Sequence, residues 1–94
     1  MWRGRDKMTR DIKHSDHLLL KIEILKAHGI DLPIEKINDI IRFPDKIDKG
    51  YKDRLIAQKR MDDEHVLRVV YEEQADKIIA ITVYPGRRSR YEKD

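Results

Sequence analysis

The hydrophobic positions in the first third of the chain recur at helical spacing. Leu18, Ile22 and Leu25 fall on one stripe of a helix that the pattern predicts over residues 16–28. Ser15 suits the N-cap of this helix, and Gly29 suits its C-terminal stop. A short extended segment over residues 11–14 is expected to lead into it.

A second, shorter helix is predicted over residues 34–42. Pro33 suits its first turn, and Phe43-Pro44-Asp45 ends it. Its inner side is formed by Ile34, Ile37, Ile40 and Ile41. Both helices therefore carry an apolar side that needs a layer to pack against.

From residue 46 onward the apolar positions alternate instead. Strands are predicted over residues 54–61, 66–72 and 77–84, joined by polar connections of hairpin length, and residues 46–49 add a short further strand. Pro85-Gly86 is expected to end the last strand. The predicted fold is α+β, with two N-terminal helices packed on one face of a three- to four-stranded antiparallel sheet.

The alternation also assigns the two faces of the sheet. Leu67, Val69 and Tyr71 share a face, as do Ile79, Ile81 and Val83, and the helices are expected to cover these. The opposite face carries Arg68, Thr82 and Tyr84, joined, depending on register, by Arg54 with Gln58 or by Lys59. Val66, Val70, Ile56 and Ile78 also point to this second face, so it is only partly polar.

Composition limits the chain to one small domain. It has 94 residues, of which 41% are charged, and no cysteine. Neither a disulfide framework nor a thiolate site can be built, and no apolar run reaches membrane-spanning length. The expected protein is cytoplasmic, with a basic N-terminal arm over residues 1–10, taken as flexible, and a single domain over residues 11–94.

The positive charge gathers at the two ends of the chain. Residues 1–13 and 77–94 each carry a net +3, and the residues between carry −3. Arg87, Arg88 and Arg90, with Tyr84 and Tyr91, combine guanidinium groups with aromatic rings, as sites for single-stranded RNA do. The alternative is a solvated basic tail.

Two further groups have chemical potential. Arg68 lies inside a Val-rich strand and needs solvent, a ligand or a carboxylate on a neighbouring strand. His17 and Lys21, one helical turn apart, form a candidate acid–base pair, or simply the polar border of the helix. His14 and His17 have a spacing that metal ligands use, but no further ligand completes a set, so neither a metal nor another cofactor is expected.

The C-terminal half resembles a known family. The stretch HVLRVVYEEQADKIIAITVYPGRRSRY is similar to the domain of unknown function 4258, and the resemblance covers roughly residues 12 to 91. That family is in turn similar to the RelE and BrnT toxins of toxin–antitoxin pairs. The turn over residues 26–30 (KAHGI) is also BrnT-like.

This resemblance implies a metal-independent endoribonuclease with an antitoxin partner and RNA as substrate. Arg68, with the closing arginines, would neutralise the scissile phosphate, and His17, Lys21 or Tyr84 would move protons. Two departures stand out: Lys21 replaces a common arginine, and Gly86 replaces alanine or serine. A non-catalytic nucleic-acid-binding or protein-interaction module is the alternative, and a homodimer through a sheet edge or the first helix is compatible with either.

Overall fold

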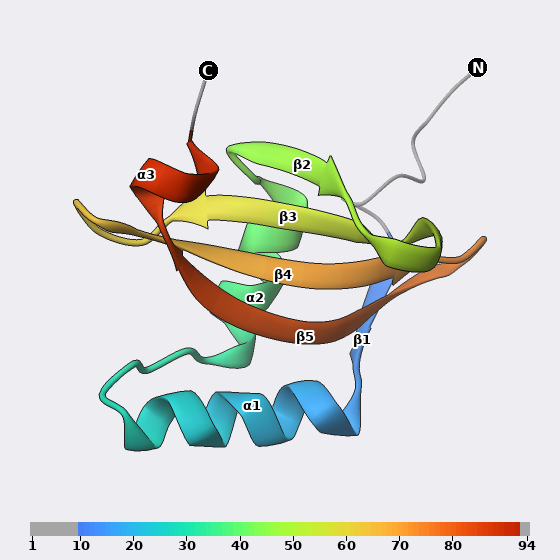
Figure 1. The fold of residues 1–94 in the computed structure, drawn as a ribbon. Coiled ribbons are helices and arrows are strands. Elements are labelled where there is room, and N and C mark those ends of the chain that lie inside the picture. Colours follow the sequence, from blue (N-terminus) through green and yellow to red (C-terminus); the bar gives the residue numbers. More distant parts are fainter. Residues whose placement is uncertain (1–9, 93–94) are drawn as a thin grey trace.

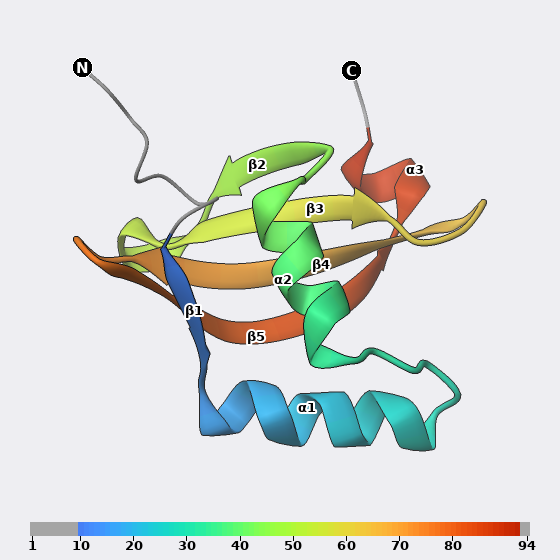
Figure 2. The ribbon, with the colours of Figure 1, turned by 180° about the vertical axis from the view of Figure 1, so that it is seen from behind.

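The protein is described here by a computed structural model, which covers residues 10–92. A sheet forms one layer, α2 crosses the back of it, and α1 runs along its lower border (Figures 1 and 2). The elements in chain order are β1 (Asp11–His14), α1 (Asp16–Ala27), α2 (Ile34–Arg42), β2 (Lys46–Lys49), the 3₁₀ turn η1 (Tyr51–Asp53), β3 (Leu55–Arg60), β4 (His65–Glu73), β5 (Lys77–Arg87) and α3 (Arg88–Tyr91).

The α+β class is as predicted, but the sheet is larger and mixed. It has five strands in the order β1-β5-β4-β3-β2. Strands β2 to β5 form the expected antiparallel meander, whereas β1 pairs in parallel with β5. The segment expected as an extended lead-in is thus an edge strand. It joins the sheet because Ile12 lies opposite Ile78 and packs against the helix-side core.

Both predicted helices form, and α1 is capped as its sequence indicates. The Leu18 N–H donates to the Ser15 hydroxyl at 3.0 Å. At the other end, the Gly29 N–H donates to the Lys26 carbonyl, and Gly29 adopts a φ of 88°, which favours glycine. Leu18 and Leu25 are buried in the core beneath the helices, which also takes in Ile37, Ile40, Ile41, Leu67, Val69 and Tyr71.

A β-bulge changes the face assignment of β5. Val70 pairs with Thr82 but Tyr71 pairs with Ala80, so Ile81 is an extra residue on β5. One added residue reverses the side to which all preceding side chains point. Val83 faces the helices as predicted, but Ile78 and Ala80 take the buried places expected for Ile79 and Ile81. The prediction was wrong for this half of the strand, because strict alternation cannot include an inserted residue.

The last strand does not end at Pro85-Gly86. It continues to Arg87 and leads directly into α3, an element that the sequence did not predict. Pro85 is tolerated because β1 pairs with β5 only as far as Ala80, so the missing N–H of Pro85 can face an unpaired edge. The arginine-rich ending therefore folds back as part of the domain.

The N-terminal arm lies outside the described residues except for Arg10. The Arg10 guanidinium donates to the Gln74 carbonyl at 2.9 Å and to the Glu73 carboxylate at 3.1 Å. It thereby ties the start of the described chain to the β4–β5 connection. Within residues 10–92 no helix is long and apolar enough to cross a membrane.

The buried Tyr71 makes stability sensitive to alkali. Burial raises the pKa of its hydroxyl to about 12, against about 10 in an unfolded chain. Below pH 10 both states keep the proton. As the pH rises from about 10 toward 12, only the unfolded chain releases this proton, so the free energy of unfolding should fall by about 2–3 kcal/mol. Tyr71→Phe should remove this loss in urea unfolding at a series of pH values, and parallel curves for the two proteins would contradict the assignment.

Candidate nucleic-acid interface

A row of four polar side chains crosses the sheet on the face opposite α2. The strand register aligns Lys46 on β2 with Gln58 on β3, Arg68 on β4 and Tyr84 on β5. We call these four residues the polar row and their side of the sheet the open face, which is turned toward the viewer in Figure 1. Gln58, rather than Lys59, joins Arg68, because Lys59 points to the helix side and pairs with Asp39 at 2.9 Å.

Arg68 is the centre of the polar row. Its Nε donates to the Tyr84 hydroxyl oxygen at 3.0 Å, and its Nη1 donates to the Asp48 carboxylate at 3.0 Å and to the Gln58 side-chain carbonyl. Only 4% of Arg68 and 1% of Gln58 are exposed. Side chains from three other strands, β2, β3 and β5, therefore hold the guanidinium in place. The sequence analysis allowed a carboxylate on a neighbouring strand as one partner for Arg68. Its ion-pair partner is Asp48, which lies two strands away.

Burial and hydrogen bonding act in opposite directions on Arg68. Burial by itself lowers the pKa of the guanidinium, but the bonds to Tyr84 and Asp48 outweigh it, and the pKa is raised above its ordinary value. The surroundings of Arg68 therefore favour the charged form of its guanidinium. Because the Tyr84 oxygen accepts a hydrogen bond from the Arg68 Nε–H, the hydroxyl proton of Tyr84 is available to another acceptor.

Tyr91 of α3 covers the guanidinium. The Arg68 Cζ lies 4.1 Å from the centre of the Tyr91 ring, a stacking distance. The ring fits here because residue 86 is glycine: a Cβ on Gly86 would lie 2.4 Å from the ring. The Gln58 amide also donates to the Tyr91 carbonyl, at 3.5 Å. The sequence analysis placed Tyr91 among the RNA-binding residues, and in this structure it closes the site.

The carboxylate of Glu92, at the C-terminal end of α3, closes this turn onto Arg88 and ties it to Arg60 of β3. Arg88 donates to this carboxylate at 2.7 Å and Arg60 at 3.2 Å. The hydrogen bonds from Arg88 and Arg60 lower the pKa of Glu92, so this attachment is complete above the ordinary pKa and weakens as the pH falls through the lowered one. Arg88 also donates to the Asp63 carbonyl at 2.6 Å.

The closing arginines therefore have different roles. Arg88 is taken up in holding α3, whereas Arg87 and Arg90 are exposed and make no ion pair among residues 10–92. Arg90 lies only near the Tyr91 ring, 5.7 Å from its centre. Arg90 thus remains as an exposed cation beside Tyr91, whereas the register pair His65–Arg87 places Arg87 on the helix side at the end of β5.

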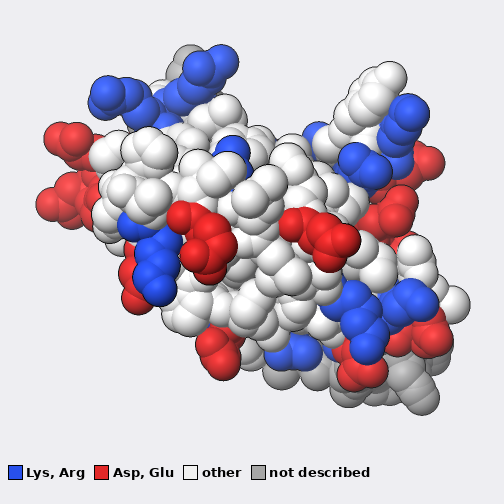
Figure 3. All heavy atoms as spheres, turned by 90° about the horizontal axis from the view of Figure 1, so that it is seen from below, with Lys and Arg blue, Asp and Glu red and all other residues white. Residues whose placement is uncertain are grey.

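The structure does not bring His17 and Lys21 to this site. Both lie on α1, which packs against β5 and buries Leu18 and Leu25 into the helix-side core, whereas Arg68 points to the open face. Seen from below, where α1 lies nearest the viewer, acidic and basic side chains are interspersed around a largely uncharged centre (Figure 3). This surface offers no continuous cationic track for a polyanion.

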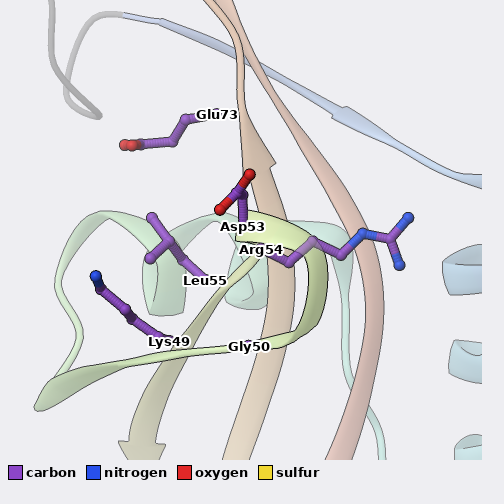
Figure 4. A pocket seen from close by; sticks show the side chains of 6 residues that line it. All are labelled: Lys49, Gly50, Asp53, Arg54, Leu55 and Glu73. Carbon is purple, nitrogen blue, oxygen red and sulfur yellow. The ribbon is translucent and has the colours of Figure 1, made fainter.

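Arg54 is likewise separate from the closing arginines. It precedes β3 and lines a pocket of about 350 Å³ with Lys49, Asp53, Leu55 and Glu73. Figure 4 shows its side chain extending away from Lys49 and Glu73. Leu55, the residue after Arg54, pairs with Tyr71 on β4, whereas Arg87 pairs with His65 on the same strand. Tyr71 and His65 are six residues apart, so Arg54 and Arg87 lie at opposite ends of β4, about 20 Å from each other.

Asp48 and Lys46 are the site residues that the sequence analysis missed. The Asp48 carboxylate is partly exposed. It forms ion pairs with the Lys46 ammonium at 3.7 Å and with the Arg68 guanidinium at 3.0 Å. Asp48 and Lys46 were assigned only to a short extra strand. The alternation of Lys46, Ile47, Asp48 and Lys49 was the available signal, since it places Lys46 and Asp48 on one face.

Among residues 10–92, no three histidine, aspartate or glutamate side chains gather in a way that could hold a metal ion. His14 instead pairs with the Asn38 side chain on the helix side, at 2.8 Å between Nε2 and Oδ1. Comparison with protein-family models, with curated proteins and with solved structures gives no match to this chain. The interpretation of the site therefore depends on its own geometry.

Gly86→Ala should dislodge Tyr91 from Arg68. The added methyl group cannot coexist with the ring, and since α3 is a single turn, we expect it to move at a cost of about 1 kcal/mol. Hydrogen exchange at the Glu92 amide, which bonds to the Arg88 carbonyl at 2.8 Å, should accelerate. In a Tyr91→Ala background, the same substitution should cost almost nothing. An equal cost in both backgrounds would show that the ring does not depend on Gly86.

Proposed function

We propose that this chain is a metal-independent endoribonuclease, the toxin of a toxin–antitoxin pair with a RelE/BrnT-like arrangement of helices on a sheet. The observation that supports this is the polar row together with Asp48: a fixed guanidinium, a phenol and a carboxylate lie together on the open face. These are the three kinds of group that RNA cleavage through the ribose 2′-hydroxyl needs.

In this proposal each group has one role. Asp48 accepts the proton of the 2′-hydroxyl as its oxygen attacks phosphorus, and the bond from phosphorus to the 5′-oxygen breaks. Tyr84 donates its hydroxyl proton to that leaving oxygen, and the products are a 2′,3′-cyclic phosphate and a 5′-hydroxyl. Arg68 supplies positive charge beside the phosphate and stabilises the oxygens on which negative charge develops.

Access to Arg68 requires the Tyr91 ring to move. The Glu92 carboxylate and its two partners, Arg88 within the turn and Arg60 on β3, are partly exposed, and ion pairs of this kind contribute little to stability. An RNA strand can therefore displace the turn at low cost. Once displaced, the Tyr91 ring can stack on a base, while Arg90 contacts a neighbouring phosphate.

The decisive test compares two tyrosines. Purified protein is incubated with a labelled mixed-sequence RNA in EDTA, and the fragments are examined for 2′,3′-cyclic phosphate ends. Tyr84→Phe should lower the cleavage rate about 100-fold or more, because it removes the proposed acid. Tyr51→Phe is the matched control: Tyr51 is 80% exposed and belongs to η1, outside the polar row, so its loss should leave the rate unchanged.

Other outcomes would redirect the assignment. Intact RNA together with salt-sensitive binding, weakened in Arg87→Ala and Arg90→Ala proteins, would mark a non-catalytic binding module. Equal cleavage by both phenylalanine variants would remove the polar row from the mechanism. For the toxin role, expression should arrest growth, and co-expression of the neighbouring gene's product should relieve it.

A further inference from the structure

The outer edge of β2 is an open pairing surface. β2 is the terminal strand of the sheet. Its odd-numbered residues, together with Asp45 just before it, are exposed, and Ile47 in its middle is 44% exposed. An edge strand with an exposed β-branched side chain at its centre is a template for another strand.

The hydrogen-bonding groups of β2 are oriented for such pairing. The Gly50 N–H donates to the Arg54 carbonyl at 2.7 Å, next to the register pair Asp48–Ile56. Along an antiparallel ladder, alternate residues direct their backbone N–H and C=O groups to the paired strand, so the backbone groups of residues 46, 48 and 50 point to β3. Ile47 and Lys49 consequently direct their backbone N–H and C=O groups to the free edge.

The sequence of this edge is complementary to itself. When two copies pair antiparallel with Ile47 opposite Ile47, Lys46 of each copy lies opposite Asp48 of the other. Asp45, just before β2, adds a carboxylate at the end of this edge nearest to Lys49 of the other copy; its N–H bonds to the Gln58 carbonyl and its carboxylate accepts from the Arg60 N–H. Residues directly opposite across an antiparallel pair share a face and interact, so both Lys46–Asp48 contacts are attractive, and Asp45 and Lys49 have opposite charges.

We propose that the chain forms a symmetric dimer through β2, which joins two five-stranded sheets into one. Phe43 and Tyr51 flank β2 before and after it, so in an antiparallel dimer Phe43 of one copy comes to the same end of the paired strands as Tyr51 of the other. These two side chains are 51% and 80% exposed in the single chain. The self-complementary charges favour a second copy over an unrelated strand as the occupant of this edge.

The dimer would connect the two polar rows. Opposite residues share a face, so the two open faces lie on the same side of the joined sheet. Lys46 of the second copy then lies beside Asp48, the carboxylate that holds Arg68 at 3.0 Å. The proposed dimer does not require RNA cleavage, and each can fail without the other.

Charge exchange at the outer pair tests the dimer. Lys49→Asp sets two carboxylates against each other at each outer contact, and Asp45→Lys sets two ammonium groups there, so each variant alone should dimerise about tenfold more weakly than the unaltered chain. Mixed together, the two variants pair aspartate with lysine at both contacts and should form heterodimers at about the original affinity. Sedimentation measures the mass against 11.3 kDa for one chain. Lys36→Asp, an equal charge change on α2, is the control and should have no effect.

A disulfide tests the register directly. The chain contains no cysteine, and Ile47→Cys would bring two cysteines about 5.5 Å apart between Cα atoms, within disulfide range. Mild oxidation should cross-link this variant but not Leu20→Cys, which exposes its thiol on α1. A chain that stays monomeric up to about 1 mM would overturn the proposal. So would a dimer that Lys49→Asp leaves intact or that Leu20→Cys cross-links equally well.

Discussion

The burial of one guanidinium constrains the entire open face. Only 4% of Arg68 is exposed to solvent, and a buried charge without partners would cost several kcal/mol. Three strands therefore supply acceptors: Asp48 from β2, Gln58 from β3 and Tyr84 from β5. The short edge strand β2 is needed for this set, because it alone supplies the anionic partner. The stacked ring of Tyr91 then closes the remaining side, which explains why the chain needs a turn after its last strand.

The helices were predictable because their signals are local. Ser15, Gly29 and the apolar stripe of α1 act within a few residues of one another, and the structure uses each as expected. The bulge at Ile81 and the parallel pairing of β1 are not local. Both depend on which strand lies alongside. The bulge is defined only by how β5 pairs with β4, so the sequence of β5 alone does not reveal it.

The site was predictable in part for the same reason. Arg68 and Tyr84 stand out as polar residues within apolar strands. Asp48 does not, because it reaches Arg68 only through the register of three strands. His17 and Lys21 were selected for their residue types and helical spacing, and neither property specifies the face of the sheet to which a helix is attached. Arg88 was selected as a phosphate-binding arginine, whereas in the folded chain its guanidinium binds the carboxylate of Glu92.

The site combines a rigid part with a weakly held cover. Moving Arg68 would break hydrogen bonds to three strands in a nearly dry environment, whereas moving Tyr91 breaks a ring contact and partly exposed ion pairs. The second change costs far less, since exposed pairs contribute little. In the proposed nuclease, an anionic ligand would displace Tyr91 and find the guanidinium already oriented. Preorganised charge of this kind loses little free energy to rearrangement when a ligand binds, which is the property that a phosphate-cleaving site requires.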